Sequence, residues 1–232
     1  EVKQMDALVD RLLEELNCDT VFTIPIFGGI PVTEAVVVTW IIIAVVFLVC
    51  KIFVRNLSVE HPKHGQLVLE SAVSWFYNFF YDILGERGKQ YIPYLMSVGI
   101  YIAIANLIGI LGFKPPTKDV NVTATLAIMS ILLIEISGVR QKGTKGWLKS
   151  FAEPMPIILP INILEIFIKP LSLCMRLFGN VLGSFVIMEL IKIVVPPVVP
   201  AVFSCYFDIF DGLIQAYVFV FLTALFVKEA TD

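Results

Sequence analysis

The sequence is short of charge. Only 16% of its 232 residues are Asp, Glu, Lys or Arg, against about 25% in typical soluble domains, whereas 58% are hydrophobic. The formal net charge is only −3, so we do not expect a nucleic acid as a partner. Apolar runs long enough to cross a bilayer recur along the chain. These features predict an integral membrane protein of the all-α, polytopic class.

Residues that usually bind metals or cofactors are also scarce. The chain has two His residues, His61 and His64, and four widely spaced Cys residues with no C-x-x-C pair. The histidines are interpreted as loop polarity and the cysteines as small hydrophobic side chains. No H-E-x-x-H, G-x-S-x-G or Walker A pattern is present, which argues against an intramembrane enzyme. We therefore expect no metal, cofactor or nucleotide site on this chain alone.

Five apolar segments are long enough to span a bilayer, and the first three are expected at 32–54, 91–113 and 120–137. Residues 61–88 differ from these segments, because they mix aromatic and polar side chains at helical spacing. That pattern indicates an amphipathic helix at the membrane interface. The sequence thus predicts five spans and one interfacial helix.

Basic side chains favour one orientation of these spans. They follow the first span at Lys51, Arg55 and Lys63, and the third span at Arg140, Lys142, Lys145 and Lys149. The positive-inside rule places both loops in the cytoplasm or its equivalent. Five spans then put residues 1–31 outside the cytoplasm, ahead of a single membrane domain of residues 32–232 whose C-terminus is inside.

The last two apolar segments are too long for an upright crossing. Helices at about 157–192 and 199–228 would be roughly 45 Å long or more, whereas the hydrocarbon layer is about 30 Å thick. They must tilt steeply or be interrupted, and Pro170 is a place for a kink or a break. We expect a steeply tilted helical hairpin.

Arg176 lies in the middle of the fourth apolar segment, where an Arg costs about 2.5–3.5 kcal/mol or more to insert. Gly179 and Gly183 lie nearby, four residues apart, a spacing that lets another backbone approach closely. At about 100° per residue, polar side chains gather within about 80° of Arg176. They are Asn162, Glu165, Lys169, Ser172, Asn180 and Ser184. Such a stripe must face protein or water, and a structural ion pair of Arg176 with Glu165 is one alternative.

The last apolar segment has a polar face of its own. Asp208, Asp211 and Gln215 are spaced i, i+3, i+7 and so share one face of an α-helix. We expect this face to meet the stripe around Arg176. Carboxylates deep in hydrocarbon need compensation, so a structural pairing of Asp208 and Asp211 close to the outer water is the alternative.

Two motifs resemble a known family. Residues 169–180 (KPLSLCMRLFGN) resemble the signature of the a subunit of F-type rotary ATP synthases, and residues 214–219 (IQAYVF) resemble its second signature. The hydropathy pattern fits the family over nearly the whole chain, except residues 1–27. The resemblance implies an H⁺- or Na⁺-translocating stator subunit that lies beside the ring of c subunits and binds the peripheral-stalk b subunits. It also implies an energy-transducing membrane, for which we favour a bacterial plasma membrane.

The resemblance also implies roles for individual residues. Arg176 would favour the ionised form of a c-subunit carboxylate beside it and would separate two aqueous half-channels. Asn180 and Gln215 would flank Arg176, and Ser172 belongs to the same polar stripe. The outer half-channel is expected at Asp208, Asp211, Glu189 and Asn106, and the inner one at Glu165, Lys169 and Asn162.

The chain departs from the family at two positions. Many members carry Glu nine residues after the arginine, where this chain has Phe185. Many carry His or an acid seven residues before the signature Gln, where this chain has Asp208. The outer half-channel is therefore expected to depend on Asp208 and Glu189.

Other functions were weighed against this interpretation. An independent ion channel or a secondary transporter with a midplane Arg site is the alternative function. A transporter is expected to contain an internal repeat with matched broken helices, and none is found in the sequence. A purely structural scaffold would have no use for a charged stripe that costs several kcal/mol.

Overall fold

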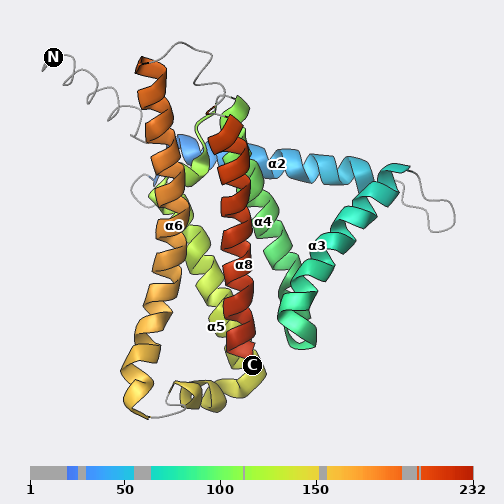
Figure 1. Cartoon of the computed structure of the whole chain (residues 1–232), viewed down its shortest axis with the longest axis vertical. Helices are drawn as coiled ribbons and strands as arrows, with labels where there is room; N and C mark the ends of the chain where they lie inside the picture. The colour runs from blue at the N-terminus through green and yellow to red at the C-terminus, as the bar shows by residue number, and fades with distance from the viewer. Residues whose placement is uncertain are drawn as a thin grey trace, which may run out of the picture.

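Four of the described helices pack side by side as a bundle (Figure 1). The computed structural model describes residues 20–25, 30–54, 64–111, 113–151, 156–194, 203 and 205–231. The bundle consists of α4 (Ile92–Leu107), α5 (Val120–Ser150), α6 (Leu159–Val194) and α8 (Gly212–Thr231). Helix α8 is in contact with each of the other three. The expected all-α class is confirmed.

Among the described residues, five helical segments are long and apolar enough to cross a membrane. They are Glu34–Val54, Gly65–Leu111, Val120–Ser150, Leu159–Met188 and Ile209–Thr231. The second of these joins the expected interfacial helix to the expected second span. The prediction of a five-span polytopic membrane protein is confirmed.

Helices α2 (Glu34–Val54) and α3 (His64–Gly88) project from the bundle. Figure 1 shows α2 running across the long axes of α6 and α8, while α3 returns towards the lower end of the bundle. The two helices and the bundle thus form three sides of a triangle. Only the first half of α2 is packed on the bundle, where Val38 and Ile42 surround Ala105 of α4.

The second half of α2 exposes large apolar side chains. Phe47 is 68% exposed and Ile52 is 64% exposed. A helix of 21 residues is about 31 Å long, which matches a hydrocarbon layer of about 30 Å when the helix is upright. Helix α2 therefore has both the length and the surface of a helix in contact with lipid.

Helix α6 is too long for the same upright crossing. Its 36 residues correspond to about 54 Å of helix, compared with a layer of about 30 Å. Pro170 lies inside α6, which continues on both sides of it, so of the two alternatives the structure supports an uninterrupted helix. The transverse direction of α2 relative to α6 and α8 in Figure 1 agrees with strong tilt, because the bundle helices are inclined to the membrane normal when α2 is upright.

Three local expectations differ from the structure. Residues 138–150 were expected to form a loop, but α5 continues through them and changes direction at Gly143, whose φ is +71°. Lys, Arg and Gln are good helix formers, so charge alone does not end a helix, whereas glycine adopts positive φ readily. Residues Cys205–Asp211 form a π-helical segment, η5, where a regular α-helix was expected.

The third difference lies in the segment before α2. No strand was expected there, but strands β1 (Thr20–Ile24) and β2 (Ile30–Thr33) pair antiparallel immediately before α2. Thr33 Oγ1 donates a hydrogen bond of 3.4 Å to Asp119 at the start of α5. The strand pair is thereby tied to the same end of the bundle as the beginning of α2.

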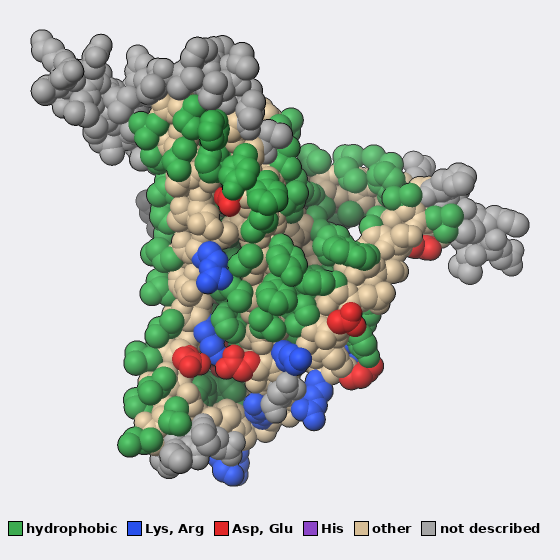
Figure 2. All heavy atoms as spheres, in the orientation of Figure 1, with side chains coloured by type: hydrophobic (Ala, Val, Ile, Leu, Met, Phe, Trp, Pro, Cys, Tyr) green, Lys and Arg blue, Asp and Glu red, His purple; other side chains and the backbone are tan. Residues whose placement is uncertain are grey.

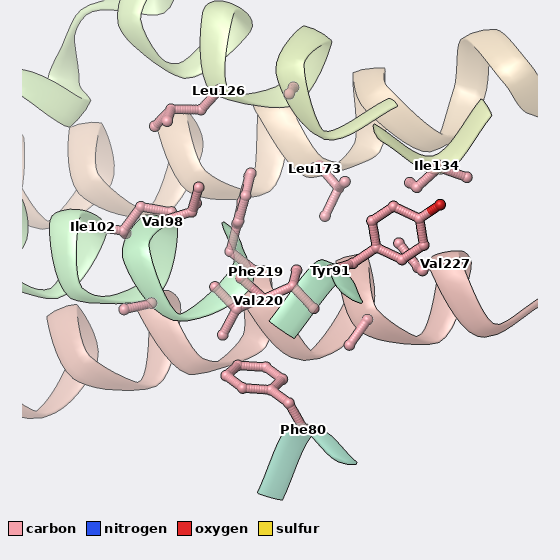
Figure 3. Close-up of a cluster of buried hydrophobic side chains, with 14 of the residues drawn as sticks. Phe80, Tyr91, Val98, Ile102, Leu126, Ile134, Leu173, Phe219, Val220 and Val227 are labelled. Atoms are coloured by element: carbon pink, nitrogen blue, oxygen red, sulfur yellow. The ribbon is translucent and has the colours of Figure 1, made fainter. Parts of the chain in front are cut away.

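The bundle core is made by side chains from all four helices and from α3 (Figure 3). Phe219 of α8 is 1% exposed and lies at the centre of this cluster. Its labelled neighbours come from α4, α5 and α6: Val98, Ile102, Leu126 and Leu173. Phe80 of α3, 2% exposed, packs against the other side of α8. Because α8 is held on several sides, the face that it presents to α6 is fixed.

A buried polar cluster holds the start of α8. Asn106 is 5% exposed, donates Nδ2 to the Gly212 carbonyl at 3.0 Å and accepts from Thr117 Oγ1 at 2.8 Å. A Cβ on residue 212 would lie 3.0 Å from the Asn106 Cβ, so only glycine fits there without movement. The cluster therefore fixes the point at which η5 ends and α8 begins.

Replacing Asn106 by leucine is expected to destabilise the fold. The change leaves the Thr117 hydroxyl buried without its acceptor and removes one donor from the Gly212 carbonyl, at a cost of about 2–3 kcal/mol. We expect the melting temperature of the purified complex to fall by about 5 °C or more. Asn121→Leu, the same change at an exposed position on α5, is the control and should leave it unchanged. Equal melting temperatures for the two variants would contradict the assignment.

Candidate functional site

Helices α6 and α8 run antiparallel, and polar side chains join them at three levels. The pairs are Ser184 with Asp211, Asn180 with Gln215, and Lys169 with Glu229. The donor–acceptor distances are 3.2, 2.7 and 3.0 Å, in that order. Asp211 and Gln215 therefore meet the polar stripe of α6.

The register of these pairs shows what lies opposite Arg176. The four-residue step from Ser184 to Asn180 on α6 corresponds to the four-residue step from Asp211, the last residue of η5, to Gln215 on α8. The next step of four on each helix places Arg176 at the level of Phe219, which is apolar and 1% exposed. Helix α8 thus offers no polar partner at the level of the arginine.

Arg176 is exposed, and no hydrogen bond or salt bridge joins it to any other described residue. Glu165 forms its ion pair with Lys169 instead, at 3.3 Å. The alternative in which Arg176 and Glu165 form a structural ion pair is therefore not supported. The guanidinium is presented to the outside of the bundle.

Two glycines continue this open surface along α6. A Cβ added at Gly179 or Gly183 would meet nothing within 4 Å among the described residues. At Gly99, in contrast, a Cβ would lie 3.2 Å from Val220, so that glycine serves packing inside the bundle. We call Arg176, Gly179, Asn180 and Gly183 the open strip of α6. Among the described residues, no helix packs closely against the two glycines of the strip.

The charged side chains are unevenly distributed over this side of the molecule. Figure 2 shows a mainly hydrophobic surface with isolated charges in its middle and a concentration of charges at the lower end of the bundle. The lower end contains the last turns of α5 and α8 and the beginning of α6 (Figure 1). Polar and charged groups therefore gather where α6 begins.

A cavity of about 310 Å³ opens at that end, between α5, α6 and α8. At about 30 Å³ per molecule, this volume holds roughly ten waters. Its charged lining residues are Glu135, Lys142, Glu165, Lys169 and Glu229. Asn162 also lines it and donates Nδ2 to the Phe151 carbonyl at 2.9 Å. The three residues expected at an inner half-channel thus share one cavity, whereas Ser172 is exposed and not among its lining residues.

Sequence reasoning missed part of this cavity. The sequence assigns no role to Glu229, whose contact with Lys169 depends on the register of α6 and α8. Trp147 Nε1 donates to Glu135 at 2.9 Å, which ties the segment after Gly143 back onto α5. In the sequence, only Gly143 indicates that the helix changes direction before Trp147.

The residues expected at the outer half-channel are only partly brought together. Asp211 contacts Ser184, but Asn106 is buried and both ends of its amide are bonded within the fold. The side chains of Asp208 and Glu189 lie outside the described residues. Because η5 is π-helical, with wider turns, the α-helical spacing assumed between Asp208 and Asp211 does not hold.

The position where the family often has Glu contacts a cation here. The ammonium of Lys118, a residue that is 6% exposed, lies 4.4 Å from the centre of the Phe185 ring. Such a contact between an ammonium and an aromatic face is attractive. A buried lysine thus lies against the position at which an acid is expected from the family pattern.

Comparison with known proteins gives consistent matches over most of the chain. The sequence profile of the family described as ATP synthase A chain matches residues 36–228. ATP synthase subunit a of Moorella thermoacetica is 35% identical over 203 residues, which cover 87% of this chain and 92% of that protein. The subunit a of Legionella pneumophila subsp. pneumophila is 32% identical over 201 residues, 86% of this chain and 87% of that protein. A protein of Propionigenium modestum named ATP synthase subunit a, sodium ion specific, is 30% identical over 216 residues, 86% of this chain and 74% of that protein.

Proposed function

The chain belongs to the ATP synthase A chain family, and on that premise we propose that it is the ion-translocating stator subunit, with Arg176 as its charge separator. Family membership makes it an integral membrane component of ATP synthase that takes part in ATP synthesis and ion transport. The rotor ring and the half-channels belong to the proposal. An independent channel or transporter is disfavoured, because the matching relatives are subunits of a larger complex.

The observation that supports this proposal is the exposure of Arg176 opposite an apolar residue of α8. A guanidinium stays protonated at any working pH, and deep in a membrane it needs water or a negative charge nearby. Among the described residues, neither α8 nor Glu165 supplies that charge, and in this proposal it comes from another chain. A carboxylate on a ring of c subunits, passing along the open strip, has the required chemistry.

The arginine then controls where the ring carboxylate is ionised. A nearby positive charge favours the ionised carboxylate, so the carboxylate releases its ion beside Arg176. The carboxylate must be neutral again before it faces lipid, and this requires loading from water on the other side of the arginine. Ions therefore cross only as the ring turns, and each charge falling through 100 mV supplies about 2.3 kcal/mol.

Polar groups on either side of Arg176 form the two half-channels in this proposal. Ser184 and its partner Asp211 lie about 12 Å from Arg176 along α6, and Lys169 with its cavity lies about 10.5 Å away in the opposite direction. The outer half-channel includes Asp211 together with Asp208 and Glu189, and the inner one includes Asn162, Glu165 and Lys169. An ion following α6 must pass Arg176 to go from one to the other.

The amide pair next to Arg176 completes this arrangement. Asn180 donates to Gln215 Oε1, while Gln215 Nε2 is buried and has no hydrogen-bond partner among the described residues. An unused buried donor is costly, so the Gln215 amide gains a hydrogen bond if it turns towards a water molecule or a carboxylate oxygen of the ring. We therefore assign Asn180 and Gln215 to the step in which the ring carboxylate passes the arginine.

The proposed orientation places the charged end of the bundle in the cytoplasm. The basic residues of α5 lie at that end, as the positive-inside rule requires. Helix α3 connects the far end of α2 to the same end of the bundle (Figure 1), so it would lie along the cytoplasmic surface. We propose a bacterial plasma membrane with the chain's N-terminus outside, and peripheral-stalk b subunits as further partners.

The translocated ion in this proposal is a monovalent cation, H⁺ or Na⁺. A relative at 30% identity is named as sodium ion specific, and the names of the other two relatives compared above specify no ion. Selection between the two ions rests with the ring carboxylate site, because Arg176 acts on the charge of that site and not on its size. Both ions are therefore included in the experiments below.

Cross-linking tests whether the open strip faces the ring. We expect Gly183→Cys to form a disulfide with a cysteine placed on the outer surface of the ring, about two helical turns outside its ion-binding carboxylate. The bond should stop ATP hydrolysis, and reduction should restore it. Phe167→Cys is the control, since Phe167 is 68% exposed on α6 but about 180° around the helix from Arg176. A disulfide from Phe167→Cys with none from Gly183→Cys would overturn the proposed placement.

A further inference from the structure

We propose that Glu229, in the last turn of α8, sets the charge of the inner cavity by compensating Lys169, and thereby sets how fast a cation leaves the region of Arg176. This inference rests on the proposed function, and it adds a residue that neither the family motifs nor the sequence pattern assigns to the ion path. The first observation behind it is the position of Lys169 relative to Arg176 on α6.

Lys169 lies on the same side of α6 as Arg176. Seven residues separate them, which correspond to about two turns, about 10.5 Å and a difference of only about 20° around the helix. An uncompensated ammonium at Lys169 would be a second positive charge on the path of the departing ion. It would repel that ion. It would also extend the positive potential of Arg176 into the exit path of the ion.

The structure compensates this ammonium from two helices. Lys169 Nζ lies 3.0 and 3.1 Å from the two carboxylate oxygens of Glu229 and 3.3 Å from Glu165. It also lies 5.2 Å from the centre of the Phe226 ring. The Lys169 side chain is 21% exposed, whereas those of Glu165 and Glu229 are 45% and 59% exposed. The ammonium is thus partly enclosed, and the carboxylates are presented to the cavity.

The charged residues that line the whole cavity also give it a negative net charge. Three carboxylates and two ammonium groups line it, which leaves one net negative charge. The triad of Glu165, Lys169 and Glu229 has the same net charge by itself. A cation released beside Arg176 therefore meets a negative region about 10 Å away, and Glu229 is the member of the triad that brings α8 into it.

Charge variants of the complete, reconstituted ATP synthase test this inference. We expect Glu229→Gln, which makes the triad neutral, to lower the initial rate of ion-driven ATP synthesis by about three- to tenfold at about 0.01 M ionic strength. The loss should shrink at about 0.15 M, where the Debye length falls from about 30 Å to about 8 Å. Choline chloride sets the ionic strength, and parallel runs use a proton gradient alone and a sodium gradient.

A double variant separates charge from structure. Lys169→Met combined with Glu229→Gln removes the ion pair but restores the net charge of −1, so its rate at low salt should exceed that of Glu229→Gln by the same three- to tenfold. Glu86→Gln breaks a comparable ion pair with Lys89 on the α3 side, outside the cavity, and should leave synthesis unchanged. A double variant as slow as Glu229→Gln at both salt concentrations would assign the pair a structural role and overturn the inference.

An Arg176→Ala sample prepared in parallel distinguishes a failure of the proposed role of Glu229 from a failure of the proposed function. If Arg176→Ala loses synthesis while Glu229→Gln matches the wild type at low salt, the inference about Glu229 is wrong and the proposed function stands. If Arg176→Ala retains coupled synthesis, the proposed function is wrong, and this inference with it. Equal amounts of ring and stator in each purified complex are the condition for either comparison.

Discussion

Ion-driven ATP synthesis is expected to fall by at least about 100-fold when Arg176 is replaced by alanine, in a complex that still assembles. The guanidinium is exposed and forms no hydrogen bond or salt bridge with another described residue, so its removal breaks no such pair among them. What it removes is the charge that favours the ionised ring carboxylate. An interaction of about 2.5–3.5 kcal/mol, the minimum cost of inserting the arginine, corresponds to about two orders of magnitude in rate.

The matched variants for this experiment are Arg176→Lys and Phe167→Ala. Lysine retains the charge but replaces a planar group with five donors by a compact ammonium, so we expect a partial loss. Phe167→Ala truncates an exposed side chain on the opposite flank of α6 and should leave synthesis near the wild-type rate. ATP synthesis in reconstituted vesicles, normalised to the amount of assembled complex, is the measurement. Coupled synthesis by the Arg176→Ala complex would show that Arg176 is not the charge separator.

Replacing Gly179 by leucine is expected to separate folding from function. A Cβ added at this position meets nothing within 4 Å among the described residues, and leucine is a better helix former than glycine by about 1 kcal/mol. The fold should therefore be unaffected or slightly more stable. Synthesis should nevertheless fall by about tenfold or more, because the new side chain occupies the surface along which the ring has to pass.

Gly65→Leu provides the control for this substitution. Gly65 is exposed in the first turn of α3, and a Cβ there would approach only Phe53, at an ordinary contact distance of 3.9 Å. The two variants are compared by thermal unfolding of the complex and by the rate of synthesis. A Gly179→Leu complex that synthesises ATP at the wild-type rate would show that the open strip does not face the ring.

The spans were predictable because a membrane constrains sequence strongly. Hydrocarbon cannot satisfy backbone polar groups, so each crossing requires a long apolar helix, and such helices are visible in composition alone. The isolation of Arg176 in the fourth span was equally visible, since a charge inside an apolar run needs an explanation. The meeting of Asp211 and Gln215 with the stripe of α6 followed from helical periodicity on each helix.

Features that depend on register or on local backbone geometry were not predictable. The pairing of Lys169 with Glu229 is set by the register of α6 against α8, and periodicity within one helix does not give that register. The π-helical turns before Gly212 have no pattern of their own in the sequence, although they decide where Asp208 lies relative to Asp211. Asn106 was expected beside water, but its amide is used to hold two other segments.

The step of four residues that separates the Ser184–Asp211 pair from the Asn180–Gln215 pair on both sides of the contact also limits how this protein can change over generations. Substitutions alter one level of the contact between the helices and leave the others in place. Insertion of one residue between Arg176 and Asn180 would rotate the arginine by about 100° relative to the amide pair and shift it by about 1.5 Å along the helix. A matching insertion in α8 would not correct that rotation. Lineages of this protein are therefore expected to vary in composition along these two segments while keeping their lengths constant.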